Sequence, residues 1–208
     1  MINELRVGPL SQGDGSQLIS RSGKTGEQIV GDAHPRYYEP TSRNGIYHGA
    51  IVGQVTTVGT ATTYTGLVLS NPVNSPVNLV ITKVGISFIV AFAAGSAVGL
   101  MTGYNIATNV THTTPVTPRS NKFNGSGGGW GLLDSSATLP TTPTVNCILG
   151  AGLTGAITTT PYIETGLVDL EGSIILPPGA YCAVYTSTAS GAAAGAFSFQ
   201  WEEVTNQI

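Results

Sequence analysis

The sequence has few charged side chains for its length. Of 208 residues, 8 are Lys or Arg and 11 are Asp or Glu, which is 9% of the chain, whereas soluble domains contain about 25%. A formal net charge of −3 lacks the basic surplus that phosphate neutralisation requires, so we expect neither nucleic acid nor an anionic membrane surface as a partner. The composition also excludes a coiled coil, which needs many Ala, Glu, Lys and Leu residues.

Cysteine is scarce and long apolar helices are not indicated. Cys147 and Cys182 each lie in an apolar run, which is typical of small buried side chains rather than of a disulfide. The chain does not begin with the basic and apolar regions of a secretory signal. Residues 84–101 carry no charge, but alternating side-chain sizes predict two adjacent strands around a Gly95-Ser96 turn rather than a membrane span.

Motifs that bind nucleotides or metals are incomplete. Ser22-Gly23-Lys24-Thr25 resembles the end of a phosphate-binding loop, but Leu18 stands where that motif requires glycine. The histidines do not form a metal-binding spacing with each other or with the cysteines; they are His34, His48 and His112. We therefore expect no cofactor and no metal.

Catalytic patterns are equally weak. A nucleophile elbow of the G-x-S-x-G type is missing from the sequence. Paired carboxylates for glycoside hydrolysis are the least favoured alternative, and Asp169 and Glu171 are their best candidates because residues two apart on a strand share one face. We expect the protein not to be an enzyme.

Strand signals dominate from residue 50 onward. The chain holds 28 Gly and 27 Thr residues, and short β-branched segments alternate with Gly and Pro turns, which indicates strands. The sequence predicts an all-β fold, a jelly-roll-like β-sandwich over residues 49–208. Nine segments are expected to be strands: 51–58, 62–72, 77–84, 86–92, 97–104, 145–149, 173–176, 180–187 and 195–204.

Residues 1–48 differ from this body in composition. They hold ten of the nineteen charged side chains and are interrupted by glycine and proline, so they cannot bury enough apolar surface to fold alone. We predict an extended, largely irregular N-terminal arm that becomes ordered against a partner or a neighbouring subunit. The alternative is a disordered tail. Aromatic and Arg side chains dominate interface energies, so the candidate anchors are Arg36, Tyr37, Tyr38 and Arg43; alternatively, these four form a short turn against the body.

The low charge of the body suggests association. A monomer of this size normally covers itself with charged residues, whereas interface cores are depleted of them. We infer that much of the outer surface contacts other chains, most simply symmetric copies. The alternative is a single Thr-rich sandwich with a neutral polar coat.

Three segments carry a resemblance to a known class of proteins. These are DAHPRYYEPTSRNGIYHG, TGLVLSNPVNSPVNLVITKVGISFIVAF and LPPGAYCAVYTSTASGAAAGAFSFQWEEV. Together they resemble small structural proteins of tailed bacteriophages, in particular capsid cement (decoration) proteins with a jelly-roll body. The resemblance implies a homotrimer on the outer surface of the virion capsid, bound to the phage major capsid protein and assembled in the bacterial host cytoplasm. It carries over no individual contact residues.

A binding module is the alternative function. A receptor- or carbohydrate-binding module of a phage tail or head fibre would expose aromatic side chains on a loop face, with Trp130 and Tyr104 as candidates.

Overall fold

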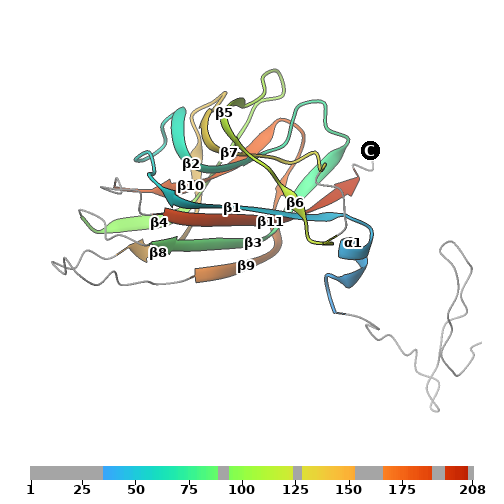
Figure 1. Ribbon diagram of the computed structural model, residues 1–208. Coiled ribbons are helices and arrows are strands. Elements are labelled where there is room, and N and C mark those ends of the chain that lie inside the picture. Colours follow the sequence, from blue (N-terminus) through green and yellow to red (C-terminus); the bar gives the residue numbers. More distant parts are fainter. Residues whose placement is uncertain (1–34, 89–93, 124–127, 153–165, 189–194, 206–208) are drawn as a thin grey trace, which may run out of the picture. The chain divides into compact units, whose positions relative to one another are not determined.

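The computed structural model describes residues 35–88, 94–123, 128–152, 166–188 and 195–205. The chain divides into two units, Met1–Glu39 and Pro40–Ile208. Most of the predicted arm lies outside the described residues. The second unit, called the body below, holds every described strand (Figure 1). The boundary predicted after residue 48 falls within the first strand, β1 (Ile46–Gln54).

The body consists of two antiparallel sheets. The five-stranded sheet has the order β6 (Arg119–Ser120), β1, β11 (Gly195–Thr205), β3 (Val77–Phe88) and β9 (Gly166–Leu176). The six-stranded sheet has the order β5 (Thr111–Val116), β7 (Leu132–Thr138), β2 (Thr63–Ser70), β10 (Ala180–Thr186), β4 (Ser96–Tyr104) and β8 (Thr144–Gly152).

The strand order confirms the predicted jelly-roll-like sandwich. Strands β1, β3, β9 and β11 form one sheet, and β2, β4, β8 and β10 form the core of the other. The chain crosses between the sheets from β1 to β2, β2 to β3, β3 to β4, β8 to β9, β9 to β10 and β10 to β11, as in a double Greek key. Strands β5 and β7 extend the second sheet beyond β2, while β6 adds to the edge of the first.

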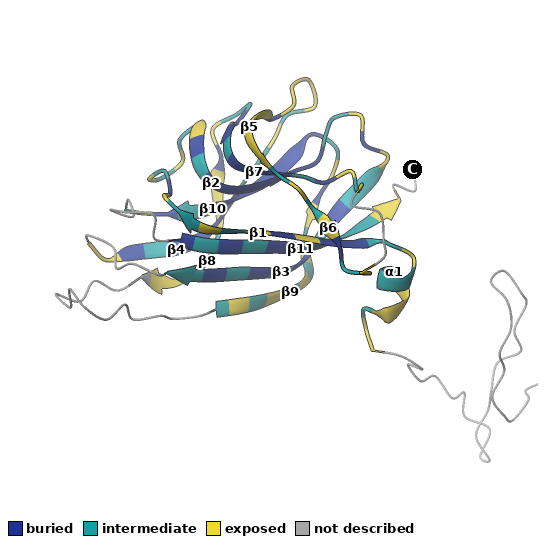
Figure 2. Cartoon of the chain, in the orientation of Figure 1, coloured by how far each residue is buried: buried dark blue, intermediate teal, exposed yellow. Residues whose placement is uncertain are grey.

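The core between the sheets follows from side-chain alternation. On β11 every second residue points inward, and Figure 2 shows the resulting pattern of buried and half-buried positions. Phe197, Phe199 and Trp201 are at most 2% exposed, and burying each contributes about 3 kcal/mol to stability. The Trp201 ring stacks on Tyr47 with centroids 6.1 Å apart.

A second apolar cluster covers the opposite face of the six-stranded sheet. Val68, Met101 and Ala183 point away from the sandwich interior and are fully buried. Val110 and Leu139, which belong to the connections next to β5 and β7, pack on them. The protein thus uses its own chain to cover the central part of the outer face of this sheet, whereas Val145 and Ile148 on the edge strand β8 are exposed.

Several sequence expectations need correction. The run 84–101 spans parts of β3 and β4, but these lie in different sheets, so the prediction of two adjacent strands is wrong. The segments 77–84 and 86–92 were expected to be separate strands, yet β3 runs unbroken to Phe88. The Thr- and Pro-rich segment 111–118, expected to be a connection, contains β5. Strand β7 was not predicted. Within the described residues, none of the helices has the length and apolar character needed to cross a membrane.

Candidate interaction surfaces

The chain enters the body through a short capped helix. Helix α1 (Tyr38–Ser42) is followed two residues later by Asn44, whose φ of 59° is in the left-handed region. The Asn44 amide donates to the Thr41 carbonyl at 3.1 Å, and the Gly45 amide donates to the Pro40 carbonyl at 2.7 Å. This pair of hydrogen bonds is a Schellman motif, which ends a helix and redirects the chain. The next residue, Ile46, begins β1.

The residues after α1 are fixed to the body by three hydrogen bonds. The Glu203 amide donates to the Gly45 carbonyl at 2.8 Å. The Lys122 ammonium donates to the Ser42 carbonyl at 3.0 Å, and the Asn121 amide donates to the Ile46 carbonyl at 2.9 Å. The point at which the arm joins the body is therefore held in place.

Glu203 joins three segments at this end of the sandwich. Its Oε1 accepts hydrogen bonds from the Gly131 amide at 2.9 Å and from the buried Trp201 indole at 3.3 Å. Burial, and secondarily the negative charge of Glu203, raise the pKa of Tyr47. Sequence reasoning missed this role, because the Gly131 contact joins residues 72 positions apart.

The structure places the four predicted anchors around α1. The Arg36 guanidinium lies 5.5 Å from the centre of the Tyr37 ring, which is a cation–π distance. Tyr38 begins α1 and is 52% exposed, while Arg43 directly follows the helix and is exposed. The structure thus brings Arg36 and Tyr37 together.

The outer face of the five-stranded sheet carries two ordered rows of side chains. Because side chains alternate along each strand, paired residues on β1, β11, β3 and β9 line up across the sheet. The polar row consists of His48, Gln200, Lys83 and Asp169. The small row next to it consists of Ala50, Ser198, Gly85 and Leu167.

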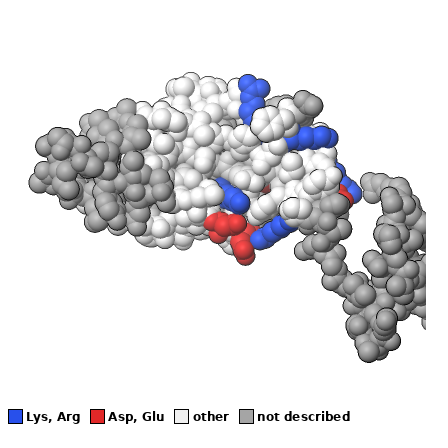
Figure 3. All heavy atoms as spheres, turned by 60° about the horizontal axis from the view of Figure 1, so that its bottom comes forward, with Lys and Arg blue, Asp and Glu red and all other residues white. Residues whose placement is uncertain are grey.

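The small row forms a shallow hollow beside an exposed leucine. Leu167 on β9 is 69% exposed, and Val52 on β1 is 77% exposed. The hollow between them has a volume of about 290 Å³ and is lined by small and apolar residues, including Ala50, Gly85 and Ser198. In Figure 3, basic side chains lie at several separate places on the described surface, most of the visible acidic side chains lie together next to basic ones, and uncharged residues cover most of the remaining described surface in that view. This sheet face is called the small-residue face below; its small row carries no charged side chain, whereas the neighbouring polar row contains Lys83 and Asp169.

Each sheet edge carries a feature that interrupts strand addition. Strand β6 has only two residues, and β5 contains Pro115, which cannot donate to a neighbouring strand. The β4–β8 ladder shifts register twice, and β9 is interrupted where Glu171 and Gly172 have φ of 50° and 80°. Short strands, proline and bulges protect edges from further pairing. The faces of the sandwich are therefore better suited to association than its edges.

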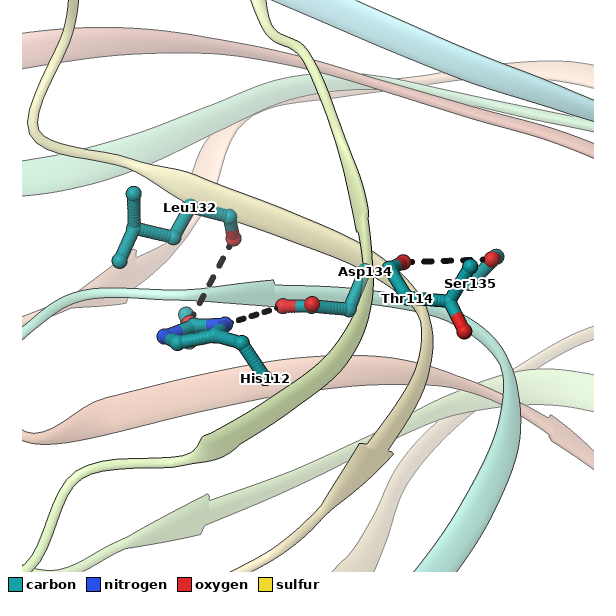
Figure 4. Close-up of polar contacts among 6 residues, drawn as sticks. His112, Thr114, Leu132, Asp134 and Ser135 are labelled. Carbon is teal, nitrogen blue, oxygen red and sulfur yellow. Dashed lines mark hydrogen bonds and ion pairs between the residues drawn. The ribbon is translucent and has the colours of Figure 1, made fainter.

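A histidine and a buried aspartate join β5 to β7. His112 Nδ1 lies 2.5 Å from Asp134 Oδ2 (Figure 4). The Asp134 side chain is fully buried, whereas the His112 side chain is 31% exposed. Burial raises the pKa of Asp134, and the hydrogen bond and charge of His112 oppose that increase. On the neighbouring residue, the Ser135 hydroxyl donates to the Thr114 carbonyl at 3.3 Å, so side-chain contacts supplement the irregular β5–β7 ladder.

The residues considered for catalysis take structural positions. The Asp169 carboxylate accepts a hydrogen bond from the Glu171 amide at 3.0 Å, and the left-handed φ of Glu171 interrupts the alternation on which a shared face depends. His48 contacts Asn121, and His34 lies outside the described residues. Cys182 is buried as expected, while Cys147 is half-buried. The described part of the chain contains no group of three or more His, Cys, Asp or Glu residues able to hold a metal ion.

Comparison with known proteins adds no relative. No protein-family model matches the chain, and neither a curated protein nor a solved structure matches it significantly.

Proposed function

We propose that the protein is a structural component of a virion, a capsid cement protein that binds the phage major capsid protein as a homotrimer and stabilises the shell. The observation that carries this proposal is the small row of the small-residue face, an uncharged strip of outer sheet surface on a jelly-roll body. The resemblance to phage cement proteins supplies the shell as the partner.

Two surfaces of the chain serve this function. The body provides an uncharged small row for contact with other chains, which matches the depletion of charge in interface cores. The arm and α1 provide Arg and Tyr side chains, which dominate interface energies. Many copies on one shell act together, because each further attachment to an assembled surface is effectively intramolecular.

A binding experiment with bare shells tests the proposal. Full-length protein and a variant lacking residues 1–39 are mixed with capsids that lack cement protein, and attachment is followed by electron microscopy. The deletion ends before Pro40 because Pro40–Gly45 belong to the capped segment of the body. We expect loss of attachment with unchanged urea unfolding of the body. A truncated protein that still decorates the shells would contradict the role of the arm.

Exposed aromatic residues favour a second candidate, a receptor- or carbohydrate-binding module. Tyr104 is 53% exposed, Trp130 is 42% exposed, and Phe123, which sequence reasoning missed, is fully exposed. Aromatic rings on a protein surface supply contact area for a ligand at low entropic cost. This candidate predicts a signal on a glycan array that Trp130→Ala removes, and a protein that does not bind shells.

A further inference from the structure

The two rows on the small-residue face have complementary ends. From β1 to β9, the polar row reads His48, Gln200, Lys83, Asp169, and the small row reads Ala50, Ser198, Gly85, Leu167. A two-fold axis parallel to the strands, midway between β11 and β3, would place β1 of one copy over β9 of the other. Each row of one copy would then face the same row of the other copy, with the order of its residues reversed.

We propose that the small-residue face binds the same face of a second copy of this chain. In this arrangement His48 faces Asp169 of the second copy, and Gln200 faces Lys83 of the second copy. A histidine opposite a carboxylate, and an amide opposite an ammonium group, are favourable pairs. The charges of the polar row thus favour the self-association of this face.

Side-chain size matches in the same arrangement. Leu167, the large exposed residue of the small row, faces Ala50, the small residue at the other end. Ser198 faces Gly85, so the centre of the contact permits close approach. The hollow of about 290 Å³ that includes Ala50 and Gly85 provides space for the leucine of the second copy. Close packing of large against small side chains is what shape-complementary interfaces require.

The rest of the body supports a face as the contact. The central part of the outer face of the six-stranded sheet is covered by the protein's own chain, and the sheet edges carry bulges, proline or very short strands. A sheet-on-sheet contact needs no free edge, since two sheets can pack face to face about 10 Å apart. Glu202 bounds the patch on one side, because in this arrangement it would face the apolar Val80.

The size of the patch determines how strong the contact is. Four strands span about 15 Å from the first to the last axis, and the two side-chain rows lie about 7 Å apart along the strands. This area is below that of a standard stable interface, about 800 Å² per partner. The contact is therefore weak between free molecules and gains strength where copies are held close together. It would add a two-fold contact to the proposed trimer, and it does not rest on the proposed function.

Cross-linking between two cysteine variants tests the contact. One protein carries Ala50→Cys and the other Leu167→Cys, each with Cys147→Ser to remove the half-buried native thiol. They are made with tags of different mass, mixed at high concentration and treated with a short bismaleimide. We expect the mixed product, which links the two different variants, to exceed either homotypic product several-fold, because Ala50 of one copy lies opposite Leu167 of the other. The proposal would be overturned if the yield of the mixed product did not exceed the yield expected from random collisions, or if no cross-linked product formed.

A charge substitution provides an independent measurement. Leu167→Asp places a carboxylate in the contact, and Ile106→Asp is the matched control, since Leu167 is 69% and Ile106 67% exposed. Each substitution is made in the otherwise unchanged full-length chain, and association is followed by sedimentation at high concentration. We expect Leu167→Asp to abolish the concentration-dependent two-fold association and Ile106→Asp to leave it unchanged. Equal effects of the two substitutions would overturn the proposal, and neither experiment requires a capsid.

Discussion

Replacing the buried Asp134 by asparagine should change how stability depends on pH. The Asp134 carboxyl is fully buried and lies 2.5 Å from His112, and its Oδ1 accepts no hydrogen bond from the described residues. Burial therefore raises the pKa of Asp134 above its ordinary value of 3.8. A carboxyl with a raised pKa binds more protons in the folded than in the unfolded state, so the folded state loses stability as pH rises through this window.

The magnitude follows from the cost of the buried charge. Leaving a buried polar group unpaired costs about 1–3 kcal/mol, and more when the group is charged. Asp134→Asn keeps an oxygen that can accept from His112 and removes the ionisation. Because the substitution also removes the attraction between the Asp134 carboxylate and His112, which opposes the effect of burial, we expect a net gain of about 1 kcal/mol above the window.

Urea unfolding of both proteins between acid and neutral pH measures this effect. Below the ordinary pKa of an aspartate, Asp134 of the wild-type protein and the asparagine of the variant are both uncharged. The two free energies of unfolding should therefore be similar there, which provides the internal control. The two curves should separate as pH rises, with the wild-type protein becoming the less stable. Parallel curves, or a wild-type protein that gains stability relative to Asp134→Asn on raising the pH, would refute the reasoning.

Two further substitutions test contacts of the body. Glu203→Ala should lower the free energy of unfolding by about 1–3 kcal/mol, because it leaves the buried Trp201 indole unpaired. Glu203→Gln should retain most of the stability and lower the pKa of Tyr47, as followed by ultraviolet titration. An unchanged tyrosine titration would contradict the contribution of the Glu203 charge. Gly99→Ala should cost about 1–3 kcal/mol in chemical denaturation, since its β-carbon would stand 2.1 Å from the Cys147 carbonyl oxygen. Gly150→Ala is the control, having open space at this position, and equal costs would count against the packing argument.

The sequence contains enough information for the fold class but not for the details of the sheets. Alternating Val, Ile and Thr residues between glycine and proline turns predict β2, β4 and β10 almost residue for residue. Strand β7 has the sequence LLDSSAT, which contains few β-branched residues and a buried aspartate, so local propensity does not reveal it. Strand β5 contains proline and forms by pairing with β7. This is a tertiary effect, so local sequence preference does not predict the strand.

The candidate surfaces were predictable only in their general nature. Charge depletion predicts that some surface of the body is suited to contact with other chains, but the face is defined by cross-strand register. Ala50 and Leu167, for example, belong to one row although they are far apart in the sequence. Glu203 is similar, because its partners are brought together only by the packing of β11 against the turn before β7.

Sedimentation velocity of the full-length protein over a wide concentration range tests the central claim most directly. If the sheet faces of the jelly roll serve as contacts between chains, the protein will sediment as a trimer or a larger assembly of its 21.3 kDa chains. A single 21.3 kDa species that persists at the highest concentrations would contradict the account.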